Sequence, residues 1–141
     1  MDSMELHTIR LLLDFGLMVL IWIVQLVIYP GLCHYGQNEL GDWHKKYTGR
    51  IGVIVGPLMI LQLIVASSQL FLQQGVYEIT SILFILALWL LTFLIFVPLH
   101  NAIKPSESCD QITGNLVSRN WGRTILWSVL FIITLLVEIL D

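Results

Sequence analysis

Four apolar runs, each long enough to cross a lipid bilayer, constrain this sequence more than any other feature. They cover residues 8–29, 51–72, 76–99 and 121–140 of a 141-residue chain. A helix needs about 20 predominantly apolar residues to span roughly 30 Å of hydrocarbon, and every run meets this length. Because a backbone in lipid must satisfy its own hydrogen bonds, we predict an all-α integral membrane protein with one domain, a four-transmembrane-helix bundle over residues 1–141.

Composition supports this class. Hydrophobic residues make up 57% of the chain and charged residues 12%, whereas soluble domains are roughly 45–50% apolar and about 25% charged. The lipid bilayer is therefore the first expected partner, and no nucleic-acid partner is expected.

The distribution of lysine and arginine predicts the orientation. Six of the seven cations flank the first and third connections: Lys45, Lys46, Arg50, Lys104, Arg119 and Arg123. Arg10 alone lies at the other side. Since cytoplasmic loops carry the excess of cations, we predict a plasma (inner) membrane protein with residues 30–49 and 101–119 in the cytoplasm and both termini outside.

The first predicted helix carries unusual polar groups. Arg10 and Asp14 are four residues apart, a spacing at which helical side chains pair, so a buried ion pair is expected. Its role is open between orienting the helix and handling protons or substrate. Gln25 is expected to bond a neighbouring helix. Tyr29, Pro30 and Gly31 should end the helix, with Tyr29 at headgroup level.

The segment after the first span reads as a short interfacial helix. Leu40, Trp43 and Tyr47 recur at helical spacing over residues 38–47, with charged residues on the opposite side. We predict an amphipathic helix that lies on the membrane surface, separate from the second span.

Gly52 and Gly56 form a GxxxG pair at the start of the second span, followed by Pro57. Such a pair allows close approach of another helix, either within the bundle or from a homo-oligomer or membrane partner. Pro57 should kink the helix.

Two stripes of polar and aromatic residues recur at spacings of three and four. In the third span they are Glu78, Ser81, Ile85, Trp89, Thr92, Phe96 and His100. In the fourth they are Asn120, Thr124, Trp127, Phe131, Thr134 and Glu138. Polar positions should face the bundle interior and not lipid. The stripes therefore predict either a packed core or a lined cavity.

The cavity interpretation gives a candidate site. Its expected walls are Trp89, Thr92, Phe96, Trp127 and Phe131, and its expected rim is Arg50, His100, Asn101 and Arg123. Guanidinium groups bind carboxylate or phosphate, and an imidazole titrates near neutral pH, so His100 is the candidate catalytic residue. No metal site is expected, because the chain lacks HxxxH, HExxH and CxxC spacings.

Two family resemblances follow from these residues. The run from Arg50 to Ile60, with His7 at the head of the first helix, resembles the HemJ type of protoporphyrinogen oxidase. The segments Pro98–Asn101 and Trp121–Arg123 are similar to the small four-helix proteins of the anthrone-oxygenase-like type. Both resemblances imply a four-helix membrane architecture and an oxidoreductase or oxygenase activity.

Three functions stay open. The first is a ligand-binding oxidoreductase or oxygenase whose pocket, open to the cytoplasmic side, takes a hydrophobic, aromatic or tetrapyrrole-like amphipathic molecule. The second is a non-enzymatic membrane subunit or assembly factor. The third is a small oligomeric carrier or channel with Asp14, Glu78 and Glu138 at an outer mouth. The cofactor is unknown: stable bis-histidine haem is not expected, because no histidine lies mid-span, whereas transient binding of haem or another tetrapyrrole is compatible with the sequence.

Overall fold

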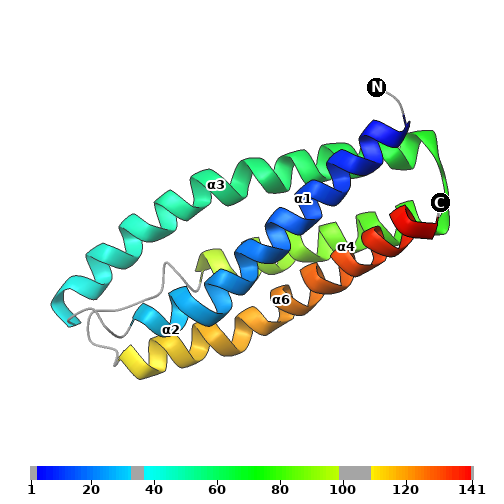
Figure 1. Cartoon of the computed structure of the whole chain (residues 1–141). Helices are drawn as coiled ribbons and strands as arrows, with labels where there is room; N and C mark the ends of the chain where they lie inside the picture. The colour runs from blue at the N-terminus through cyan, green and yellow to red at the C-terminus, as the bar shows by residue number, and fades with distance from the viewer. Residues whose placement is uncertain (1–2, 33–36, 99–108, 141) are drawn as a thin grey trace.

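The computed structural model describes residues 3–32, 37–98 and 109–140, and these are helical except for the short turn at residues 73–75 (Figure 1). The elements in order are α1 (Ser3–Ile23), the π-helical η1 (Val24–Ile28), α2 (Tyr29–Gly31), α3 (Gln37–Leu72), α4 (Val76–Leu91), the π-helical η3 (Thr92–Phe96) and α6 (Cys109–Leu140). Consecutive long helices run in opposite directions, and both ends of the chain lie at the same end of the bundle.

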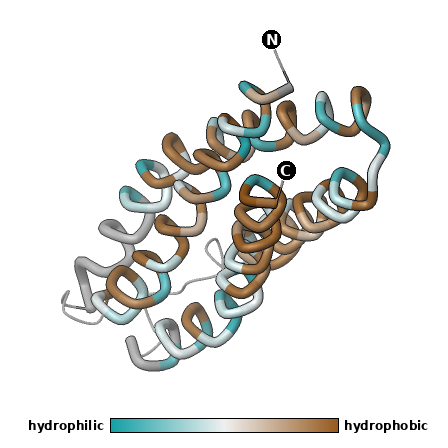
Figure 2. Tube along the Cα trace, turned by 45° about the vertical axis from the view of Figure 1, so that its right-hand side comes forward, coloured by the Kyte–Doolittle hydropathy of each residue, from teal (hydrophilic) through white to brown (hydrophobic). Residues whose placement is uncertain are grey.

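Four helical segments are long and apolar enough to cross a membrane, as predicted. They are Met4–Gly31, Lys46–Leu72, Val76–Phe96 and Thr113–Leu140. Figure 2 shows hydrophobic residues along the middle of the bundle and hydrophilic ones concentrated toward its ends. Large apolar side chains such as Val53, Leu83 and Ile125 point outward, which suits a surface that faces lipid.

The helices form a ring in which α1 packs against α3 and α6, and α4 packs against the same two helices. Its centre is apolar and fully buried, with Leu17, Ile85, Leu88 and Leu130 at 0% exposure. A polar cluster lies on each side of this apolar layer. Asp14 belongs to one cluster and Gln25 to the other, about 16 Å apart along the first helix at 1.5 Å per residue.

Two predicted helix boundaries are wrong. The separate interfacial helix over residues 38–47 does not exist, because α3 runs unbroken for 36 residues from Gln37. No proline and no reversal of the chain separates Tyr47 from Ile51, so the amphipathic segment simply continues into the span. The last helix begins at Cys109, well before residue 121.

The first span ends at Gly31, as Tyr29, Pro30 and Gly31 predict. Pro30 and Pro98 are themselves helical, and each is the second residue after a π-helical segment. In these turns the N–H of Tyr29 bonds the carbonyl of Val24, and the N–H of Val97 bonds that of Thr92. A proline ring crowds the carbonyl four residues earlier, and a widened turn at that place relieves the clash. Pro57 lies inside α3 without interrupting it.

Candidate functional site

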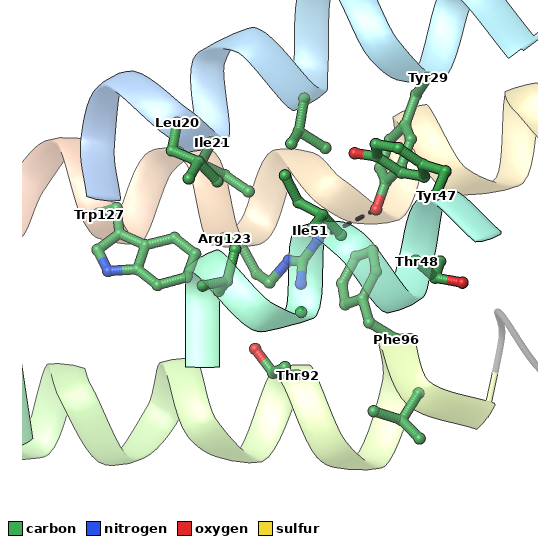
Figure 3. Close-up of a pocket in the computed structure, with 14 residues that line it drawn as sticks. Leu20, Ile21, Tyr29, Tyr47, Thr48, Ile51, Thr92, Phe96, Arg123 and Trp127 are labelled. Atoms are coloured by element: carbon green, nitrogen blue, oxygen red, sulfur yellow. Dashed lines mark hydrogen bonds between the residues drawn. The ribbon is translucent and has the colours of Figure 1, made fainter. Parts of the chain in front are cut away.

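A cavity of about 160 Å³ lies inside the bundle, on the side of the apolar layer away from the termini (Figure 3). All four spans contribute to its wall: the first through α1, η1 and α2, the second through α3, the third through η3, and the fourth through α6. The lining residues are mostly apolar: Leu20, Ile21, Val24, Ile51, Gly52, Val55, Phe96, Val97 and Trp127, with Tyr29, Tyr47, Thr48, Thr92 and Arg123 as the polar members. Such a cavity suits a mainly hydrophobic occupant with one polar end.

Arg123 supplies the charge at this cavity and is only 8% exposed. Its Nε and Nη2 atoms both donate to Oδ1 of Asn120, at 2.9 and 2.5 Å. Nη2 also donates to the hydroxyl of Tyr29 at 3.3 Å. The guanidinium is thus held in one position by uncharged groups from α6 and α2.

Hydrogen bonds to Gln25 and Thr124 hold Asn120 in place. Its Nδ2 donates to Oε1 of Gln25 at 2.8 Å, and Nε2 of Gln25 donates to the carbonyl of Val117 at 3.2 Å. Thr124 donates to the same Gln25 oxygen at 3.4 Å. Gln25 therefore makes the interhelical bond expected of it, and it ties η1 to α6 behind Arg123.

Phe96 covers one face of the guanidinium, with Cζ of Arg123 3.4 Å from the ring centroid. A cation over a desolvated aromatic face is attracted by the ring quadrupole. Phe96 ends the π-helical segment η3, and Val24 of the cavity wall begins η1. Both irregular turns therefore deliver residues to this cavity, and π-turns are frequent at functional sites.

The other polar cluster, which we name the Asp14 centre, contains Arg10, Asp14, Gln62, Gln69, Ser81 and Thr134. The predicted ion pair is present: Nε of Arg10 lies 2.9 Å from both carboxylate oxygens of Asp14, and both side chains are fully buried. All four long helices contribute a side chain. Among the described residues, the charge of Arg10 is therefore balanced by the charge of Asp14.

The Asp14 carboxylate also accepts hydrogen bonds from Gln62 at 2.6 Å and from Thr134 at 2.7 Å. Arg10 donates to Ser81 at 2.7 Å and to Gln69 at 3.5 Å. Asp14 is therefore enclosed in the protein and does not line an outer mouth with Glu78 and Glu138. Glu138 instead lies 3.9 Å from Nδ1 of His7.

The structure brings only some of the predicted site residues together. Thr92, Phe96, Arg123 and Trp127 line the cavity. Arg50 is exposed and does not line it. His100 and Asn101 lie outside the described residues.

Trp89 and Phe131 also lie away from the cavity. Trp89 stacks on the exposed ring of Phe93 at 5.4 Å, because Leu88 takes the interior position at that level. Phe131 packs against Phe15 at 5.5 Å, beside the buried Leu130. Each is one position off the buried face of its helix.

Sequence reasoning missed the wall formed by the first two spans. The sequence places Tyr29 by its depth alone; in the structure it is 2% exposed and its hydroxyl accepts a hydrogen bond from Arg123. Tyr47 was assigned to the surface helix and is also buried at the cavity. A signal existed: both tyrosines sit at the same end of their spans as Arg123, and a tyrosine hydroxyl suits a buried guanidinium.

Among the described residues, no group of three or more His, Cys, Asp or Glu side chains is placed to hold a metal ion. Comparisons of the chain with family models, curated proteins and solved structures found no match.

Proposed function

We propose that this four-span membrane protein binds a small hydrophobic molecule with a polar head in the cavity beside Arg123. The observation that carries the proposal is the cavity itself: apolar side chains from all four spans surround it, and one buried cation, Arg123, lies in its wall. An amphipathic ligand matches this distribution, with its hydrocarbon part against Val24, Val55 and Trp127 and its head toward Arg123.

The volume of the cavity limits the size of the ligand. An apolar cavity of about 150 Å³ holds one benzene molecule, so about 160 Å³ takes one ring or a short chain. A tetrapyrrole has four rings and exceeds the space as it stands. The volume therefore favours a single-ring or short-chain molecule over haem.

An oxidoreductase or oxygenase activity on this ligand is a further proposal that rests on the two family resemblances. His100 would then be the catalytic residue. An absorbance spectrum of the purified protein tests the cofactor part, since a bound flavin or tetrapyrrole would absorb visible light.

The loosely packed glycines of α3 favour the alternative of a membrane subunit. A Cβ atom added at Gly52 or Gly56 would meet no other group within 4 Å, so among the described residues no helix packs closely on the GxxxG pair, although Gly52 also lines the cavity. A partner helix or a second copy can approach there. Crosslinking through a cysteine at position 53 tests this alternative.

A matched pair of variants tests the cavity. Val55 lines it, whereas Val53 is 74% exposed on the same helix. Val55→Phe should fill the space and weaken benzyl alcohol binding at least about 10-fold, the expected scale for losing one desolvated hydrophobic contact. Val53→Phe should leave binding unchanged. Equal binding by both variants would place the ligand elsewhere and refute the proposed function.

A further inference from the structure

We propose that the ligand of this cavity is a monocarboxylate with a single ring or a chain of similar size, whose carboxylate is the counterion of Arg123. The inference rests on the proposed function, because it names the ligand class of the same cavity. Three features of the site lead to it: the charge of Arg123, its remaining donors and the size of the apolar wall.

The charge of Arg123 is not neutralised within the part of the chain that the structure describes. The comparison with Arg10 makes this clear, since both arginines are at least nine-tenths buried. Arg10 has the carboxylate of Asp14 at 2.9 Å, whereas Arg123 has the neutral amide of Asn120 at that distance. An unpaired buried charge carries a large desolvation penalty, which an anion in the adjoining cavity would offset.

The remaining donors of Arg123 define how that anion binds. Nε and Nη2 are occupied by Asn120 and Tyr29, and Phe96 covers one face of the group. Among the described residues, Nη1 makes no hydrogen bond, so its two N–H groups are available to a ligand. One carboxylate oxygen can accept a hydrogen bond from Nη1 while Asn120 and Tyr29 keep their hydrogen bonds to Nε and Nη2.

A single negative charge fits this arrangement better than a phosphate monoester. A phosphate brings a charge between about −1.5 and −2 and three strong acceptor oxygens, whereas the described cavity wall offers one guanidinium among mostly apolar groups. The excess charge would stay uncompensated in an apolar site. A carboxylate brings one charge and two oxygens, which match one arginine.

The experiment uses three probes with the same ring: benzoate, benzyl alcohol and phenyl phosphate. Each is titrated calorimetrically into the full chain in phosphatidylcholine nanodiscs. A charge-assisted hydrogen bond is worth enough that benzoate should bind about 10- to 100-fold tighter than benzyl alcohol. Phenyl phosphate should bind more weakly than benzoate.

Two variants test the assignment to Arg123, and one serves as control. Arg123→Gln removes the charge, and Asn120→Asp leaves the arginine in place while giving it an internal carboxylate. Both should abolish the preference for benzoate over benzyl alcohol. Asn120→Asp keeps the test valid if Arg123→Gln fails to fold. Arg119→Gln, an exposed position one turn earlier in α6, should retain the preference.

The outcomes separate this inference from the proposed function. Equal binding of benzoate and benzyl alcohol would overturn the carboxylate assignment and leave the cavity function standing. Binding of none of the probes would overturn both. Tighter binding of phenyl phosphate, or displacement of benzoate by added phosphatidylglycerol, would overturn the carboxylate in favour of a phosphate group from a free ligand or a lipid, respectively.

Discussion

Arg123 donates from Nε at 2.9 Å and from Nη2 at 2.5 Å to one and the same oxygen of Asn120. The neutral amide of Asn120 holds the guanidinium in position but does not neutralise its charge. The choice of Asn over Asp therefore keeps a fixed cation at the cavity wall, and the stability of the protein should depend on that choice.

Changing Asn120 should alter the free energy of unfolding in opposite directions. Asn120→Leu removes the acceptor of a buried cation and should destabilise the ligand-free protein by about 1.5–3 kcal/mol. Asn120→Asp supplies a counterion and should stabilise it. Denaturant unfolding in bicelles measures both, with Asn115→Leu at an exposed position of α6 as control. Because Asn120→Asp also removes the donor to Gln25, a destabilisation as large as that of Asn120→Leu would argue against an unpaired Arg123.

The Arg10–Asp14 pair should behave as a coupled unit. Arg10→Ala and Asp14→Ala each leave an unpaired buried charge and should each destabilise by about 3–5 kcal/mol. The double variant should cost clearly less than the sum of the two, because it leaves no orphaned charge. The same unfolding assay measures the cycle. Strict additivity would mean that the two side chains do not interact.

The ring of Phe96 should stabilise the cationic site. Phe96→Leu removes the aromatic face 3.4 Å from Arg123 and should cost about 0.5–2 kcal/mol beyond the change in apolar packing. Phe93→Leu is the matched control, because Phe93 is on the same π-helical segment and 55% exposed. Equal effects of the two changes in the unfolding assay would argue against the cation–π contact.

The cation asymmetry predicts the orientation in the membrane. Cys33 and Cys109 fall in or beside the two connections expected in the cytoplasm, so a membrane-impermeant thiol reagent should label neither in intact cells and both after permeabilisation. A tag after Asp141 should be accessible from outside. Labelling of intact cells together with a protected tag would reverse the orientation.

Single-helix spacing allowed part of this site to be predicted. Arg10 and Asp14 pair as expected because four residues bring two side chains together on any α-helix. The stripe of α6 correctly placed Asn120, Thr124, Trp127 and Thr134 on one buried face. The prediction that Phe131 lines the cavity was wrong. Spacing along one helix does not show which residues at the border of its buried face are covered, because that depends on the neighbouring helix.

The sequence alone determined that four apolar helices can cross a membrane and that polar residues on them face inward, since lipid offers no hydrogen-bond partners. Only the tertiary structure decided which polar groups meet. Tyr29 and Tyr47 come from different helices, and the π-turn that precedes Pro30 shifts the rotation of the chain beyond it, so no regular period predicts that Tyr29 reaches Arg123. The tertiary structure also determines how the two arginines differ. Arg10 pairs with Asp14 one turn away, whereas Arg123 is surrounded by amides, hydroxyls and an aromatic ring.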